Sequence, residues 1–180
     1  FRRVLFRSVA LITAKYHYKY NEQRYFMDLE KVDFKKMVDA RILDSKLKSL
    51  MWITPEYPND PIRELNLLKD AVNILKNDNR NKMVITHYSF LSLLTEQNLH
   101  MPSRWYVSNN TYPHSDHKYF NFYKNFFYKN YIKNDIQIVY IVDKSGIKFD
   151  DFRKNFDDIC FNNKKVNEIT FLFEPFKCKK

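Results

Sequence analysis

Apolar and polar positions along this chain form blocks that predict helices followed by strands. The clearest helix begins at Asp60 and Pro61, because aspartate is a good N-cap and proline fits the first helical turn. The residues that then recur with the helical period of three or four are Leu65, Leu68, Ala71, Val72 and Leu75. The polar run KNDNRNK ends this helix, and the apolar run over residues 83–86 predicts a buried strand.

The same succession occurs twice more. A second amphipathic helix is predicted over residues 119–132, followed by a strand over 136–142. Its expected buried stripe consists of Tyr119, Tyr123, Phe126, Phe127 and Tyr131. The third unit has a helix near 149–159, a polar NNKK turn and a strand over 168–173. Apolar strands that alternate with helices favour parallel pairing, so we predict a small Rossmann-like α/β fold whose mainly parallel sheet has about three to five strands covered by helices.

The region before residue 60 is more polar and its pattern is weaker. Alternating tyrosines over residues 16–20 suggest a strand, and helical spacing follows from Glu22 to Val32. Asp33 is placed to cap a further short helix, and residues 50–54 predict a short buried strand.

The first fourteen residues need separate treatment from the rest of the chain. Residues 1–8 match the in-frame translation of a common sequencing-library adapter, so we expect them to be an artefact. Residues 9–14 form a short apolar run with two interpretations, a buried strand or the end of a truncated membrane helix, and the run is far too short to span a bilayer. We expect residues 15–180 to form one soluble α/β domain.

Composition excludes several function classes. The chain has 180 residues, a formal net charge of +10 and a single glycine, Gly146. Phosphate-binding loops need several glycines, so neither a dinucleotide-binding fingerprint nor a P-loop is present, and we expect no cofactor. The positive charge is dispersed without a block of like charges, which argues against nucleic acid as a partner.

The only cysteines are Cys160 and Cys178, and their spacing fits no zinc motif. They are buried thiols in a reducing compartment, or a disulfide worth about 3 kcal/mol in an oxidising one. The sequence leaves both interpretations open.

Candidate ligand-binding residues follow from the rule that open parallel sheets bind ligands beyond the carboxyl ends of their strands. The rule selects the residues after the two central strands and the long loop that leaves from the same edge. The substrate-binding candidates are His87, Tyr88, Arg104, Trp105, Tyr106 and His114, with Asp143 and Lys144 beside them. Arg104 with its aromatic neighbours suits an anion or a sugar, although a loop anchored by a buried tryptophan is an equally physical interpretation.

No catalytic or metal-binding residue can be assigned. His87, His100, His114, Asp116 and His117 cluster in the sequence, but they do not form a ligand frame such as HExxH. Ser89 lies near His87, yet the GxSxG elbow of hydrolases is absent.

The strings YNEQRYF, LMWITPEYPNDP, NKMVITHYSF, PSRWY, HKYFNFYKNFF and KNDIQIVYIVD occur in this order over roughly residues 16–178. In this order they resemble the C-terminal region of bacterial membrane glycosyltransferase-like proteins, relatives of the dolichyl-phosphate-mannose protein mannosyltransferases of the GT-C class. The resemblance implies an accessory domain on the periplasmic side of the bacterial inner membrane, attached to the membrane-embedded remainder of the same polypeptide. It also implies a glycan or a lipid-linked sugar as ligand and an oxidising environment for the cysteines. The catalytic part of that family has no counterpart here.

Three hypotheses result. The first is the accessory domain of a membrane glycosyltransferase, and the second is a free-standing α/β enzyme or ligand-binding protein with a cleft at the strand ends. The third, a nucleic-acid binder, predicts a steep salt dependence of binding.

Overall fold

The computed structural model describes residues 2–18, 29, 32–103, 112–144, 147 and 149–178. The chain divides into two compact units, residues 1–65 and residues 66–180, and helix α2 (Pro61–Asn77) crosses the boundary between them. Each unit is described by itself below.

Unit 1 begins with helix α1 (Arg2–Tyr16), whose side chains are exposed from Phe6 onward. Residues 9–14 lie inside this helix, so the strand interpretation of that run is wrong. The strand predicted at the tyrosines is wrong as well, because Tyr16 ends α1 and Tyr18 lies in the helical turn directly after it. The predicted helix over residues 22–32 falls almost entirely outside the described residues.

Three short 3₁₀ helices follow, η3 (Phe34–Lys36), η4 (Ala40–Ile42) and η5 (Ser45–Leu47). Each begins after an aspartate whose side chain accepts a hydrogen bond from the backbone N–H two residues further on; these are Asp33, Asp39 and Asp44. The cap predicted at Asp33 is therefore confirmed. Strands β1 (Val38–Asp39) and β2 (Met51–Trp52) form a small antiparallel pair, shorter than the predicted strand over 50–54.

A buried carboxylate holds the end of unit 1 together. Glu64 is fully buried and accepts hydrogen bonds from Trp52 Nε1 and Thr54 Oγ1, each at 2.8 Å. Burying a charge is favourable only where donors surround it; here one donor, Trp52, lies in β2 and the other, Thr54, follows that strand. The predicted cap of α2 is also present, since Asp60 Oδ1 accepts from the Arg63 N–H at 3.0 Å.

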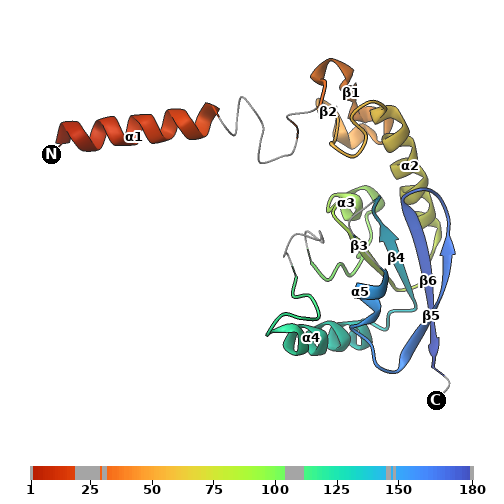
Figure 1. Cartoon of the computed structure of the whole chain (residues 1–180). Helices are drawn as coiled ribbons and strands as arrows, with labels where there is room; N and C mark the ends of the chain where they lie inside the picture. The colour runs from red at the N-terminus through yellow and green to blue at the C-terminus, as the bar shows by residue number, and fades with distance from the viewer. Residues whose placement is uncertain are drawn as a thin grey trace. The chain divides into compact units, whose positions relative to one another are not determined.

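Unit 2 contains a four-stranded sheet in the order β3-β4-β6-β5 (Figure 1). The strands are β3 (Lys82–Thr86), β4 (Ile138–Val142), β5 (Ile159–Lys165) and β6 (Thr170–Lys177). The helices are the remainder of α2, α3 (Leu91–Thr95), α4 (Phe120–Lys133) and α5 (Phe149–Arg153). The strands β3 and β4 and the helices α2 and α4 confirm their predicted positions.

The predicted mainly parallel, Rossmann-like sheet is wrong. Only β3 and β4 pair in parallel, whereas β6 is antiparallel to both β4 and β5. The reason lies in the last connection, because the four residues 166–169 between β5 and β6 suffice only for a hairpin, and a parallel crossover needs a dozen or more. The fold is a mixed α/β arrangement with two sheets.

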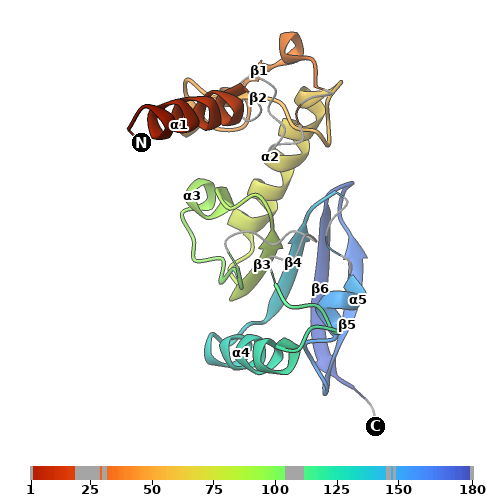
Figure 2. The same cartoon turned by 60° about the vertical axis from the view of Figure 1, so that its left-hand side comes forward.

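The two faces of the larger sheet are covered differently (Figure 2). One face packs against α4 and α5 through a cluster of buried apolar residues centred on Phe127, Phe152 and Phe156. Strand residues in this cluster include Met83, Ile85, Val139, Ile141 and Phe173. Tyr140 points to the opposite face, where its hydroxyl donates to Asp78 at the end of α2 at 2.7 Å. The buried residues of α2 in unit 2 are Leu68, Ala71, Val72 and Leu75.

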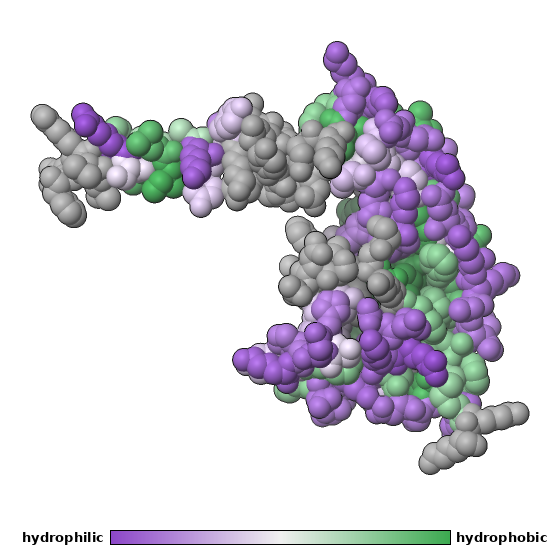
Figure 3. All heavy atoms as spheres, in the orientation of Figure 1, coloured by the Kyte–Doolittle hydropathy of each residue, from purple (hydrophilic) through white to green (hydrophobic). Residues whose placement is uncertain are grey.

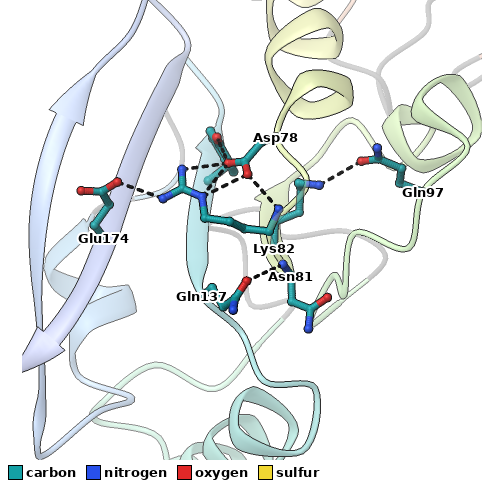
Figure 4. Close-up of polar contacts among 8 residues, drawn as sticks. Asp78, Asn81, Lys82, Gln97, Gln137 and Glu174 are labelled. Carbon is teal, nitrogen blue, oxygen red and sulfur yellow. Dashed lines mark hydrogen bonds and ion pairs between the residues drawn. The ribbon is translucent and has the colours of Figure 1, made fainter.

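A network of polar side chains surrounds the start of β3 (Figure 4). The Arg80 guanidinium lies between Asp78, at 2.9 Å, and Glu174 of β6, at 3.0 Å. The buried Lys82 donates to Gln97 Oε1 at 3.0 Å, and Asn81 N–H donates to Gln137 Oε1 at 3.2 Å. These contacts link the start of β3 to the segment after α3 through Gln97 and to the segment before β4 through Gln137. Arg80 also links it to β6, which is the third strand of the sheet.

Cys160 and Cys178 form a disulfide with an S–S distance of 2.09 Å and a Cα–Cα distance of 5.1 Å. Cys160 pairs with Phe176 in the β5–β6 ladder, which places Cys178 diagonally opposite on the same side of the hairpin. Of the two interpretations that the sequence left open, the structure shows the cross-link.

Candidate functional site at the carboxyl ends of β3 and β4

The two parallel strands end side by side, and the residue that follows each of them joins a polar pair. Thr86 of β3 is in register with Val142 of β4, so His87 and Asp143 emerge at the same edge of the sheet. His87 Nδ1 lies 2.7 Å from Asp143 Oδ1. The side chain of Asp143 is 4% exposed, whereas that of His87 is 26% exposed, so the imidazole is the member of the pair that solvent or a ligand reaches.

Backbone groups fix the carboxylate of this pair. Asp143 Oδ2 accepts the Ile147 N–H at 2.8 Å, and the Asp143 N–H donates to the Ile169 carbonyl at 2.8 Å. A buried carboxylate whose second oxygen is held by a backbone N–H orients the imidazole and selects its tautomer. With Nδ1 engaged, Nε2 is the nitrogen of His87 that remains for a ligand.

The turn after β3 is built by a threonine hydroxyl. Thr86 Oγ1 donates to the Val142 carbonyl at 2.7 Å and accepts the Tyr88 N–H at 2.9 Å. The Tyr88 side chain is buried, and its ring centroid lies 3.8 Å from that of His87. Tyr88 therefore supports the imidazole by packing and is not itself a surface for a ligand.

Tyr112 extends the site and was not among the predicted residues. The ring is buried, and burial raises the pKa of its hydroxyl, with further contributions from the negative charges of Asp151 and Asp143. Tyr112 is therefore close enough to Asp143, at the carboxyl end of β4, to feel its charge. Its ring centroid is 4.8 Å from that of His114, which brings His114 to the same region. In the sequence Tyr112 carried no signal beyond its place in a long loop after β3.

The predicted residues thus have different outcomes. His87 and Tyr88 lie at the strand ends as the edge rule predicts, and His114 joins them through Tyr112. Arg104, Trp105 and Tyr106 lie outside the described residues, and Lys144 is exposed. Among the residues that the structure describes, no group of three histidine, cysteine or acidic side chains could hold a metal ion.

A hollow of about 240 Å³ lies elsewhere in unit 2, between the segment after α3 and helix α4. Its walls include Met83, Met101, Pro102, Phe126 and Phe127, with His100, Asn130 and Asn134 as polar members. Burial lowers the pKa of His100, and the positive charge of Lys82 lowers it further. Of the predicted substrate-binding residues that the structure describes, His87, Tyr88 and His114, none lines this hollow.

No family model, curated protein or solved structure matches the chain closely enough to indicate a relative. Among the described helices, none combines the length and the apolar character that crossing a bilayer requires. The resemblance to membrane glycosyltransferases therefore stays a prediction from the motifs.

Proposed function

We propose that this chain is an extracytoplasmic accessory domain of a membrane glycosyltransferase, and that it binds a glycan at the carboxyl ends of β3 and β4. The observation that carries the ligand site is the pair formed by His87 and Asp143. A buried carboxylate that orients a partly exposed imidazole presents one directed polar group in an aromatic setting, which suits a hydroxyl-rich ligand.

Two further observations support the setting of this site. The disulfide between Cys160 and Cys178 favours an oxidising compartment, because such bonds persist outside the cytosol. The ordered motifs from residue 16 to 178 support attachment to a glycosyltransferase of the GT-C class. The sugar donor of such enzymes is lipid-linked, so the partner of this domain is the membrane-embedded part of the same polypeptide.

Binding is tested by nuclear magnetic resonance titration of the protein with mannose, glucose, galactose and their disaccharides. We expect chemical-shift changes concentrated at residues 86–88 and 143–147. The variant His87→Gln should weaken binding by about tenfold or more, because the hydrogen bond between the ligand and the oriented imidazole is lost. His117→Gln is the matched control, since His117 is exposed and its imidazole accepts the Tyr119 backbone N–H at 3.2 Å, away from Asp143. Shifts that are absent, or equal in both variants, would remove the glycan site.

Attachment to a glycosyltransferase is tested separately by sequencing the source locus upstream of residue 9. The proposal expects an open reading frame that encodes several membrane spans. An initiator methionine next to residue 9 would end it, while leaving the glycan site to be judged by the titration.

A second candidate is a free-standing enzyme that uses His87 as a general base. The specific observation in its favour is the 2.7 Å contact with a buried aspartate, since an oriented imidazole is the usual acid–base group of enzymes. This candidate predicts turnover of a soluble substrate without membranes, and a rate that disappears in His87→Gln and persists in His117→Gln.

A further inference from the structure

The outer face of α4 exposes three aromatic rings in one line. Tyr119 precedes the helix, and Phe122 and Phe126 lie on it, with exposed fractions of 57%, 77% and 53%. Their spacing of three and four residues places them on the same side of the helix. Burial of these rings is the usual outcome in a folded domain, so an exposed row indicates a surface that meets a partner.

Two lysines continue the same line toward the end of the helix. Lys129 and Lys133 follow Phe126 at the same spacing of three and four residues. Neither forms an ion pair within the described part of the chain, and α4 has no acidic residue. We call Tyr119, Phe122, Phe126, Lys129 and Lys133 the aromatic–lysine stripe.

The fold does not need this stripe. The opposite side of α4 carries Phe127 and Tyr131, which are buried in the aromatic cluster against the sheet. The prediction that Tyr119 and Phe126 belong to the buried stripe was wrong, because Phe127 and Tyr131 already fill the space against α5. Both views of unit 2 place α4 at its outside, and Figure 3 shows hydrophilic and hydrophobic residues mixed over it.

The apolar surface extends beyond the stripe. Ile132 is 55% exposed and Phe176 of β6 is 45% exposed, and both line one open groove together with Lys177 and the acidic Asp158. The groove thus adds exposed apolar side chains on a second element of unit 2, whereas the excess of positive charge lies on the stripe itself.

We propose that the aromatic–lysine stripe docks onto the surface of an anionic lipid bilayer. Phenylalanine rings enter the boundary between headgroups and acyl chains, while lysines keep their ammonium groups among anionic headgroups. The stripe is a ridge on a helix, which a deformable lipid surface accommodates. Single-stranded nucleic acid is usually held in a positively charged groove, whereas this stripe is a ridge on a helix, so nucleic acid fits the surface less well. The inference does not depend on the glycan site at His87.

Vesicle flotation of the full chain tests the proposal. We expect binding to vesicles of phosphatidylcholine with about one third phosphatidylglycerol, weak binding to phosphatidylcholine alone, and a loss of affinity with added salt. The double variants Phe122→Ala/Phe126→Ala and Lys129→Gln/Lys133→Gln should each bind about tenfold or more weakly. Lys129→Arg/Lys133→Arg should retain binding. Leu93→Ala is the matched control, because Leu93 is 59% exposed on α3, away from the stripe.

The helix α1 is also basic and exposes apolar residues, so binding of the full chain must be traced to α4 directly. The described cysteines are both in the disulfide, which makes an introduced thiol a unique labelling site. An environment-sensitive dye at Asn125→Cys, beside the stripe, should shift to shorter wavelength when anionic vesicles are added, and the same dye at Leu93→Cys should not.

Several results would overturn the proposal. They are a dye at residue 125 that does not respond, equal binding to neutral vesicles, and double variants that bind like the unchanged protein. Tighter binding to a single-stranded oligonucleotide than to anionic vesicles would assign the surface to nucleic acid. Self-association that Phe122→Ala/Phe126→Ala abolishes, in the absence of vesicle binding, would assign it to a second copy of the chain.

Discussion

The free energy of unfolding should fall between pH 6 and pH 3, and the contacts of Asp78 determine how much of this fall that residue contributes. Burial alone would raise the pKa of this carboxyl, but hydrogen bonds from Arg80 and Tyr140 outweigh burial and lower its pKa from 3.8 to about 2. A tenfold change in proton affinity is about 1.4 kcal/mol, so the ionised form stabilises the fold by about 2 kcal/mol at neutral pH. Asp78 has a side chain only 11% exposed, so solvent screens little of this contribution.

The sign of the effect follows from the direction of that change. A carboxyl with a depressed pKa in the folded state contributes fully above its unfolded pKa and loses the contribution as pH falls through the folded pKa. The contribution should therefore be complete at pH 6 and about 1 kcal/mol smaller at pH 3, with the rest lost below that.

Urea denaturation of the unchanged protein and of Asp78→Asn, each at pH 6 and pH 3, isolates this group from the other carboxyls. The gap in unfolding free energy between the two proteins should narrow by about 1 kcal/mol at the lower pH. Asp150→Asn is the control, because that side chain is exposed on α5 and forms no hydrogen bond or ion pair with the described residues. A gap that is the same at both pH values would show that the Arg80 and Tyr140 contacts do not set the proton affinity of Asp78.

Two further predictions concern unit 2. Replacing both Cys160 and Cys178 by serine opens a cross-link that spans 18 residues, so the unfolding free energy in urea should fall by about 3 kcal/mol. A fall below about 1 kcal/mol would mean that the hairpin is held without the bond. Phe127→Ala should cost about 3–5 kcal/mol in the same assay because its ring is buried among aromatic neighbours, whereas Phe122→Ala on the exposed side of α4 should change stability by less than about 0.5 kcal/mol. Equal losses in the two variants would contradict the orientation of α4.

The long periodic segments and the short apolar runs between them were predictable. Helix α2 has a capped start, a regular apolar period and a polar end, and all three signals act locally. Strands β3 and β4 are buried on both faces, so their continuous apolar runs are visible in the sequence. His87 and Asp143, which the edge rule selected, follow those two strands and contact each other, while their role in binding stays a prediction.

The third predicted helix–strand succession, over residues 149–173, was misplaced because the polar sequence of an edge strand resembles that of a turn. The NNKK run, taken for a turn, is the exposed half of β5, where charged residues protect an open edge. The actual turn follows it, and Asn167 Oδ1 accepts the N–H groups of Ile169 and Thr170 in place of a glycine turn. The parallel sheet was predicted from three successive helix–strand units, and the third of these units depended on the misplaced turn. Helix α5 is likewise shorter than predicted and ends at Arg153.

The pair of His87 and Asp143 and the disulfide lie at opposite ends of the sheet. The proposed glycan binding and the proposed oxidising compartment can therefore be tested independently. Asp143 follows the end of β4 that pairs with the start of β6, whereas Cys178 follows the far end of β6. Reduction of the bond should therefore lower the stability of the β5–β6 hairpin without changing the contact between His87 and Asp143. Ligand affinity that survives reduction, at temperatures where the protein stays folded, would show that the oxidising compartment matters for stability and that the strand-end pair acts independently. Affinity that disappears while the fold persists would mean that the hairpin itself takes part in binding, because the pair at the other edge is left unchanged.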